Sequence, residues 1–363
     1  MSAYRESIIT GGATSQKNCW MRRCQIIFES KYNVNDVLSK TDAERTYLER
    51  LEQKYPGLKT QGGIRYIVGD ETGDNLSISI NGTKQIGLDL DNGTIQISNM
   101  SYESLAKIMA LKLFRITINV GYKNNDTLFT IAKGEISYIQ QKIRTRRTVD
   151  VYITYASELV AAWSQSRINF SMRSGVNMYE MFNWMFLQQG CPTKRLGISP
   201  ELKSLVAQNI YSASATTKDV ITSALGSYAN TGQFLLTSDG SITNRVIDIT
   251  NIAEKRIIKI NKNIINLVNG NPQVTANGLN ITLFPVVQFV PGDIIQLDNS
   301  LIDTSAGMTN QSGVQSTFNT AYVDPNGCYI IRQINYTFQN RGEDFTFKIQ
   351  AIALNQYKNL IGV

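Results

Sequence analysis

The last third of the chain alternates apolar and polar side chains in short runs, and this alternation constrains the fold more than any other feature. From Ser238 to Val363 the runs are separated by Asn-Gly and Pro-Gly pairs, and they end in the segment Gly327–Leu354. A period of two is typical of strands with one buried face, and these dipeptides are typical of turns. Gly327–Leu354 is therefore predicted to form paired strands. It contains few side chains that could do chemistry, so the pattern favours a protein that builds a structure over one that converts a substrate.

The composition also favours a structural protein over an enzyme. The chain has 363 residues, enough for two or three domains with cores of their own, and it contains no histidine. Histidine is the commonest general base, metal ligand and partner of a Ser or Cys nucleophile. The four cysteines have no zinc-type spacing, and no apolar stretch is long enough to cross a membrane. We therefore expect a non-enzymatic protein with reduced thiols, without cofactor or metal and without insertion into a membrane.

The net charge of +7 permits binding to an anionic partner. The basic residues are spread along the chain, and they cluster only at Lys142, Arg144, Arg146 and Arg147. We interpret this cluster as a loop that faces solvent or a partner protein, and we expect no specific nucleic-acid binding. A nucleic-acid-binding module that uses these arginines stays an alternative.

The first segment has the pattern of a β-barrel-like unit that carries helices. Asn81-Gly82 and Asn92-Gly93 are dipeptides that favour tight hairpin turns, and we expect turns there. Helices are predicted at Thr41–Gly57 and Ser101–Leu113 from capping residues and helical spacing. The predicted strands are Cys24–Ser30, the period-two runs that begin at Ile64, Phe114–Tyr122, Leu128–Ile143 and Thr148–Ala156.

The middle segment changes to helical patterns. Met178, Met181, Phe182 and Met185 recur at i, i+3, i+4 and i+7, which predicts a helix that is covered on most sides, with a hydrophobic binding groove as the alternative. A weaker helical pattern follows between residues 202 and 228. The predicted fold class is therefore β-rich α+β, with two tube-like β-barrel domains at 1–156 and 238–363. They flank a smaller mixed α/β insertion domain at 157–237.

Paired carboxylates offer the main route to catalysis in a chain without histidine. A glycosidase needs one protonated and one ionised carboxyl group a few ångströms apart. No spacing selects a pair among the candidates Glu135, Glu158, Glu180, Asp293 and Glu343. A peptidoglycan hydrolase on a β-rich scaffold therefore stays an alternative without a defined site.

Four segments resemble the hub proteins of bacteriophage tails. They are Ile118–Ala156 with its paired strands, Arg173–Gly190 with a strand, a glycine and a helix, Asn277–Leu297 with a Pro-Gly-Asp turn, and the terminal hairpin Gly327–Ile352. The family includes the baseplate hub of contractile phages, the late-control hub of temperate phages and the corresponding part of type VI secretion spikes.

The resemblance implies a homotrimer in the virion tail or baseplate, assembled in the host cytoplasm. Two tube-like domains per copy would give six similar units, which match a six-fold tail tube above and a trimeric central spike below. Further partners would be the tape measure protein and the baseplate wedge. We expect partner-facing loops at 144–147 and 300–319. The expected interface residues are Phe114, Ile116, Arg144, Arg146, Arg147, Tyr152, Tyr329, Arg332, Tyr336, Arg341 and Phe345.

Overall fold

The computed structural model describes most of the strand-rich parts of the chain. The described residues are 21–30, 59–60, 64–69, 76–86, 92–111, 114–123, 127–156, 167–188, 196–198, 203–207, 211–228, 234–238, 244–248, 257–260, 272–275, 278–302 and 323–354. The predicted helix at 41–57 and most of the predicted loop at 300–319 lie outside them.

Strands dominate the described residues, as the sequence predicts. The first part contains β1 (Arg22–Ser30), β2 (Lys59–Thr60), β3 (Ile64–Val68), β4 (Ser77–Gln85), β5 (Asn92–Ser101), α2 (Tyr102–Ala110), β6 (Phe114–Tyr122), β7 (Thr127–Ile143) and β8 (Thr148–Ala156). The last part contains β14 (Ile257–Ile260), β15 (Gln273–Thr275), β16 (Gly278–Leu283), β17 (Ile294–Leu297), η7 (Asn299–Leu301), β18 (Cys328–Gln339) and β19 (Phe345–Ala353). The predicted strands of both ends are thus confirmed where they fall on described residues, with bounds that differ by one to a few residues.

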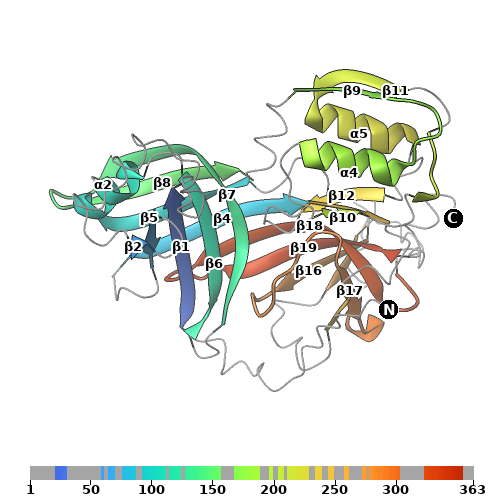
Figure 1. Cartoon of the computed structure of the whole chain (residues 1–363). Helices are drawn as coiled ribbons and strands as arrows, with labels where there is room; N and C mark the ends of the chain where they lie inside the picture. Colours follow the sequence, from blue (N-terminus) through green and yellow to red (C-terminus); the bar gives the residue numbers. More distant parts are fainter. Residues whose placement is uncertain are drawn as a thin grey trace, which may run out of the picture.

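The two strand-rich ends belong to one 14-stranded sheet. Its path runs β15-β16-β19-β18-β4-β5-β8-β7-β6-β1-β3-β2, and β17 and β14 branch from β18. The join between the ends is the antiparallel pair β4–β18, in which Ser79 lies opposite Gln339 and Gln85 opposite Gln333. Residues about 250 positions apart in sequence are therefore neighbours in one hydrogen-bonded wall (Figure 1).

One hydrophobic core extends across this join. It includes Ile26 of β1, Ile97 of β5, Ile153 of β8 and Ile334 of β18 in a single cluster. Aromatic rings link its two ends in an edge-to-face series. The ring centroids are 5.3 Å apart for Tyr122 and Phe345, 5.1 Å for Phe338 and Phe345, and 5.0 Å for Phe338 and Phe347.

The predicted turns at Asn81-Gly82 and Asn92-Gly93 are wrong. Both dipeptides lie inside strands, β4 and β5, where Gly82 is directly opposite Gly93. Neither glycine has a positive φ. The reason for glycine is steric, because a Cβ at Gly82 would overlap the phenol of Tyr336 and one at Gly93 would overlap that of Tyr155.

The middle part forms a small unit with two short sheets. It contains β9 (Arg167–Met172), α4 (Met178–Gln188), β10 (Leu196–Ile198), β11 (Tyr211–Thr216), α5 (Thr217–Tyr228), β12 (Phe234–Ser238) and β13 (Asn244–Asp248). The two sheets are β10-β13-β12 and β11-β9; in Figure 1, α4, α5 and the β9–β11 pair are drawn above the large sheet. Strand β11 pairs with β9, so the sequence-based prediction of a helical pattern from 202 is wrong for residues 211–216. The methionine helix is confirmed, since Met178, Met181, Phe182 and Met185 are buried.

No helix among the described residues is long and apolar enough to cross a membrane.

Candidate assembly surfaces

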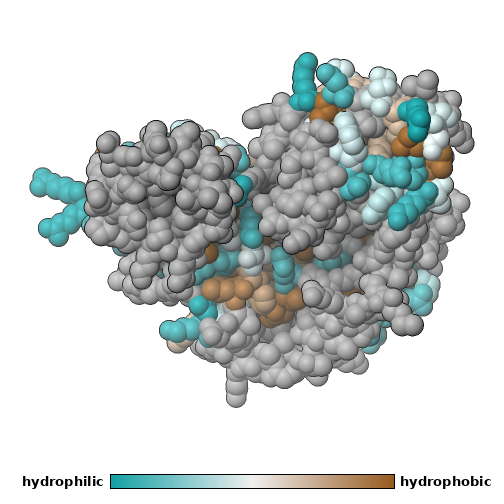
Figure 2. Space-filling model, in the orientation of Figure 1, coloured by the Kyte–Doolittle hydropathy of each residue, from teal (hydrophilic) through white to brown (hydrophobic). Residues whose placement is uncertain are grey.

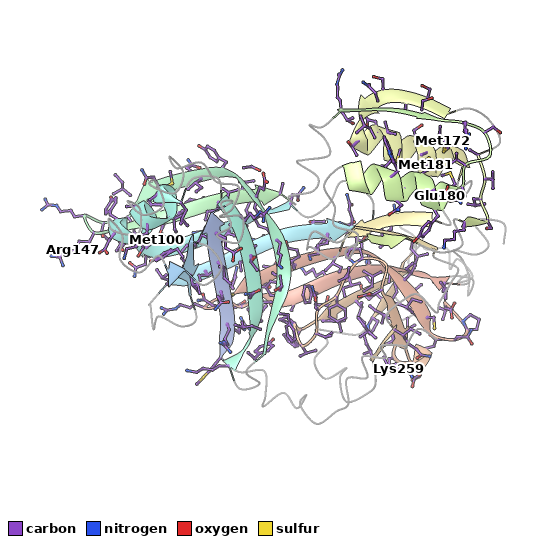
Figure 3. All side chains as sticks on the ribbon, viewed as in Figure 1. Met100, Arg147, Met172, Glu180, Met181 and Lys259 are labelled. Carbon is purple, nitrogen blue, oxygen red and sulfur yellow. The ribbon has the colours of Figure 1, made fainter. Side chains whose placement is uncertain are left out.

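The β7–β8 hairpin carries the predicted basic cluster at its tip. Its turn is held by Thr145, whose hydroxyl accepts hydrogen bonds from the backbone N–H of Arg147 (3.2 Å) and of Thr148 (3.0 Å). Arg144 forms an ion pair with Asp150 at 3.4 Å, while Arg146 and Arg147 are exposed. Figure 3 shows Arg147 at the outer end of the hairpin, and Figure 2 shows a hydrophilic projection at the same end of the molecule. The fixed turn therefore presents two cations to solvent.

The outer face of the sheet carries rows of uncharged polar side chains. Residues directly opposite each other on paired strands have side chains on the same face. One row crosses five strands from both ends of the chain, namely Gln85, Gln333, Gln350, Asn280 and Gln273. Gln350, Asn280 and Gln273 are exposed, and the other two are half-buried.

A second row runs beside the amide row. Asn335 of β18 lies opposite Thr83 of β4, and its side-chain oxygen accepts hydrogen bonds from the Thr83 hydroxyl (2.8 Å) and from Gln333 Nε2 (3.1 Å). Lys348 of β19 completes this part of the row as an exposed cation. The β4–β18 join is thus covered by amides and hydroxyls, which fix its register across the outer face.

Four of the expected interface residues lie in the core of the chain. Ile116, Tyr329, Tyr336 and Phe345 are all at most 2% exposed. Tyr336 shares a hydrogen bond with the hydroxyl of Tyr155, and Phe345 packs against other aromatic rings. These side chains hold the fold together.

Tyr329 donates a hydrogen bond to Asn299 Oδ1 at 3.1 Å, next to the turn that precedes β18. Burial raises its pKa to about 12. In the turn, the Asp324 carboxylate accepts hydrogen bonds from the backbone N–H of Asn326 (2.8 Å) and of Cys328 (3.2 Å). Burial also raises the pKa of the Cys328 thiol, and Asp324 raises it further. The thiol therefore stays protonated at neutral pH, as expected for a structural cysteine.

The remaining expected interface residues are exposed, except Phe114, whose side chain is outside the described set. Tyr152 lies on the outer face of β8, opposite Gln96 and Gln140. Arg332 is at the irregularity of β18, and Arg341 is in the turn between β18 and β19. The structure therefore divides the expected residues into a buried set and an exposed set.

The candidate carboxylates lie on separate elements. Glu135 is on β7, Glu180 on α4 and Glu343 in the β18–β19 turn. Asp293 is buried and accepts a hydrogen bond from the backbone N–H of Val290 at 3.1 Å, which is a turn-stabilising role. Glu158 lies outside the described residues. In the part of the chain that the structure describes, no group of three or more acidic or cysteine side chains could hold a metal ion.

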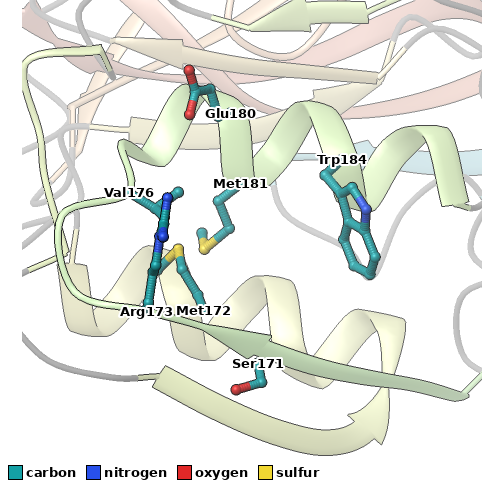
Figure 4. Close-up of a pocket in the computed structure, with 7 residues that line it drawn as sticks. All are labelled: Ser171, Met172, Arg173, Val176, Glu180, Met181 and Trp184. Carbon is teal, nitrogen blue, oxygen red and sulfur yellow. The ribbon is translucent and has the colours of Figure 1, made fainter.

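The small unit contains an open cavity of about 420 Å³ between α4 and β9. In Figure 4, the thioethers of Met172 and Met181 face each other across the cavity, and the indole of Trp184 lies further along α4. Trp184 is 43% exposed, although the helical pattern predicts that this helix is covered on most sides. Arg173 and Glu180 are exposed at the rim.

Sequence reasoning missed the paired glycines and the half of β7 that β6 does not accompany. Both Asn-Gly pairs lie within alternating runs, which was the available clue. A glycine inside a strand often marks a place where another group packs closely against the backbone. The clue to β7 was its length, since 17 residues cannot all be matched by the nine of β6.

No protein-family model matches the chain, and no curated protein matches its sequence. Among solved structures, it is similar to the 43 kDa tail protein of prophage MuSo2 from Shewanella oneidensis (TM-score 0.48, 8% identity, 80% of this chain and 95% of that one). It is also similar to an E. coli type VI secretion component described as resembling the T4 tail proteins gp27 and gp5 (TM-score 0.49, 10% identity, 78% and 75%). A third match is the Francisella PdpA-VgrG complex in its half-lidded form (TM-score 0.46, 10% identity, 92% and 58%).

These neighbours are phage tail proteins and type VI secretion proteins, the families to which the sequence shows a resemblance.

Proposed function

We propose that the chain is a structural protein of a phage-type tail, and specifically the hub that joins a six-fold tube to a trimeric central spike. The observation that carries the proposal is the single sheet that both ends of the chain build together through the β4–β18 pair. A wall of this kind suits a protein that encloses a space, and the resemblance of four sequence segments to tail hubs supports the same role.

The rows of polar side chains would form the lining of the channel. The polar face of the sheet, which points away from the hydrophobic core, carries Gln333, Gln350 and Asn280. In a ring of copies, this polar face would line the channel. Apart from the exposed cation of Lys348, these rows consist of amides and hydroxyls, which remain hydrated and offer no fixed charge to a charged polymer that passes along them. Such a wall would let cargo slide without holding it.

In the proposed arrangement, the two strand-rich ends of each copy, which share one sheet, act as two similar tube-forming units, and three copies close into a ring of six such units. The small middle unit, from β9 to β13, lies outside this ring. Closure satisfies sheet edges through neighbouring copies and removes edges that would otherwise aggregate. The partners are the tail tube, the central spike, the tape measure protein and the baseplate wedge, in a virion tail assembled in the host cytoplasm.

Exposed side chains form the proposed interface between copies. They are Tyr152, Arg332, Arg341 and the arginines of the β7–β8 turn. The buried side chains of Ile116, Tyr329, Tyr336 and Phe345 contribute only indirectly, by holding their strands in place.

The mass of the particle in solution tests the proposal. Light scattering of the purified chain, alone and with its central spike protein, is expected to give three copies per particle. A chain that stays monomeric at high concentration, also with its spike, would refute the hub.

A further inference from the structure

The β7 strand has an open edge along its second half. β6 accompanies β7 only as far as the pair Arg115 and Glu135. From Tyr138 to Ile143, β7 pairs with β8 on one side, and no described strand lies on the other side. This half of β7 extends beyond the point where β6 begins, so its outward edge is unpaired among the described strands.

The hydrogen-bond pattern shows which backbone groups face this edge. The backbone N–H of Arg144 donates to the carbonyl of Thr148 at 3.1 Å, which makes these two residues a hydrogen-bonded pair of the ladder. Such pairs alternate with non-bonded pairs along an antiparallel ladder. The N–H and C=O groups of Ile139, Gln141 and Ile143 therefore point away from β8, toward the open edge.

Large apolar side chains accompany these groups. Ile143 is 73% exposed, the highest value among the large apolar side chains that the structure describes, and Tyr138 is 60% exposed. Their side chains lie on opposite faces of the strand, so both faces of an added strand would find an apolar neighbour. An exposed edge with apolar side chains is a ready template for another chain.

The charges near the edge select the kind of chain. Lys142, Arg144, Arg146 and Arg147 are exposed on this hairpin, and the neighbouring carboxylate of Asp150 is taken by Arg144. Two copies of this edge would bring like charges together, which disfavours their pairing. A strand that carries carboxylates would meet these cations with complementary charge and would be steered to them.

We propose that the open edge of β7, from Tyr138 to Ile143, binds an extended acidic strand of another protein by adding it to the sheet. Main-chain hydrogen bonds to Ile139, Gln141 and Ile143 would supply binding, and the cations of the hairpin would supply the preference for an acidic sequence. The proposal concerns the chemistry of one partner segment and does not depend on ring closure.

Hydrogen exchange of the full chain tests the proposal directly. The probe is a synthetic peptide in which glutamate and valine alternate, and the control peptide has lysine in place of glutamate. The acidic peptide, at up to about 1 mM, is expected to slow exchange of the amides of Ile139, Gln141 and Ile143 by roughly tenfold. The amides of Tyr138, Gln140 and Lys142, which already bond to β8, are expected to change little.

Each other outcome would overturn the proposal. Unchanged exchange would show that the edge does not accept a strand, and equal protection by the lysine peptide would remove the charge preference. Edge amides that exchange slowly without peptide would show that the edge is already covered. A dependence of that protection on protein concentration would identify a second copy as the cover.

Variants separate the backbone contribution from the charges. Gln141→Pro removes an N–H that faces the open edge and leaves the bonds to β8 intact, so the peptide-induced protection is expected to be lost. Gln141→Ala is the matched control and is expected to behave as the wild type. Arg146→Glu with Arg147→Glu is expected to weaken binding of the acidic peptide about tenfold and to favour the lysine peptide. Wild-type behaviour of the proline and charge-reversed variants would contradict the assignment.

Discussion

At the scale of single residues, two tyrosines and two glycines pack together where the two ends of the chain meet. Tyr155 of β8 and Tyr336 of β18 share a hydrogen bond in the core, and their phenols lie over Gly93 and Gly82. A larger residue at either glycine would displace a buried ring. The pair therefore explains why glycine occurs in the middle of strands, where it otherwise weakens a sheet.

Replacing Gly82 with alanine tests this explanation. Because the new methyl group would overlap the buried phenol of Tyr336, Gly82→Ala is expected to lower the free energy of unfolding by roughly 1–3 kcal/mol. The measurement is the midpoint of denaturant unfolding. Asn81→Ala, on the solvent face of the same strand, is the control and is expected to change it by about 0.5 kcal/mol or less. Equal effects of the two substitutions would count against the packing role.

Tyr329 makes the free energy of unfolding depend on pH in the alkaline range. Burial raises its pKa to about 12 from an ordinary 10, so the unfolded chain releases this proton at a lower pH than the folded chain does. The stability contributed by this residue is complete below pH 10 and is lost as the pH rises from 10 to 12. The loss is expected to reach about 2 kcal/mol.

The comparison with Tyr329→Phe isolates this effect, since all other tyrosines are common to both proteins. The free energy of unfolding of the wild type is expected to fall more steeply above pH 10 than that of the variant. Parallel curves over this range would show that Tyr329 ionises as readily in the folded chain as in the unfolded one.

At the scale of the elements, strands were the most predictable part of the molecule. The bounds of β6 and β8 agree with the alternating runs Phe114–Tyr122 and Thr148–Ala156. The error at residues 211–216 arose because alanine, serine and threonine carry little periodicity, and pairing with β9 decided their conformation.

The neighbours of each strand could not be predicted from the sequence. Alternation shows which face of a strand is buried, but nothing local selects β18 as the partner of β4. The same limit applied to the interface residues. Tyr336 and Phe345 are aromatic residues in strands, and only the assembled sheet shows that they point into the core.

The predicted cap of α2 provides a test at this scale. Ser101 Oγ accepts a hydrogen bond from the backbone N–H of Ser104 at 3.0 Å and so satisfies one donor of the first turn. Ser101→Ala is expected to lower the free energy of unfolding by about 1 kcal/mol. Ser101→Asp can still cap the helix and is expected to retain most of the stability. Chemical denaturation measures both, and equal losses would argue against the cap.

At the scale of the whole molecule, the shared core predicts that the two ends of the chain unfold together. Phe338 of β18 is fully buried and contacts the rings of Phe345 and Phe347. Phe338→Ala is expected to cost about 3–5 kcal/mol. Hydrogen exchange is expected to accelerate in β5 and β8 as well as in β19, since β4 joins them to β18. Acceleration confined to β18 and β19 would mean that the two ends are independent.

The central claim is that copies of this chain close into a ring around a channel. Electron microscopy of the purified particle, viewed along its axis, tests this claim most directly. The account predicts class averages with three-fold symmetry, six similar lobes and a central opening. Compact particles of a single copy, without symmetry or opening, would contradict it.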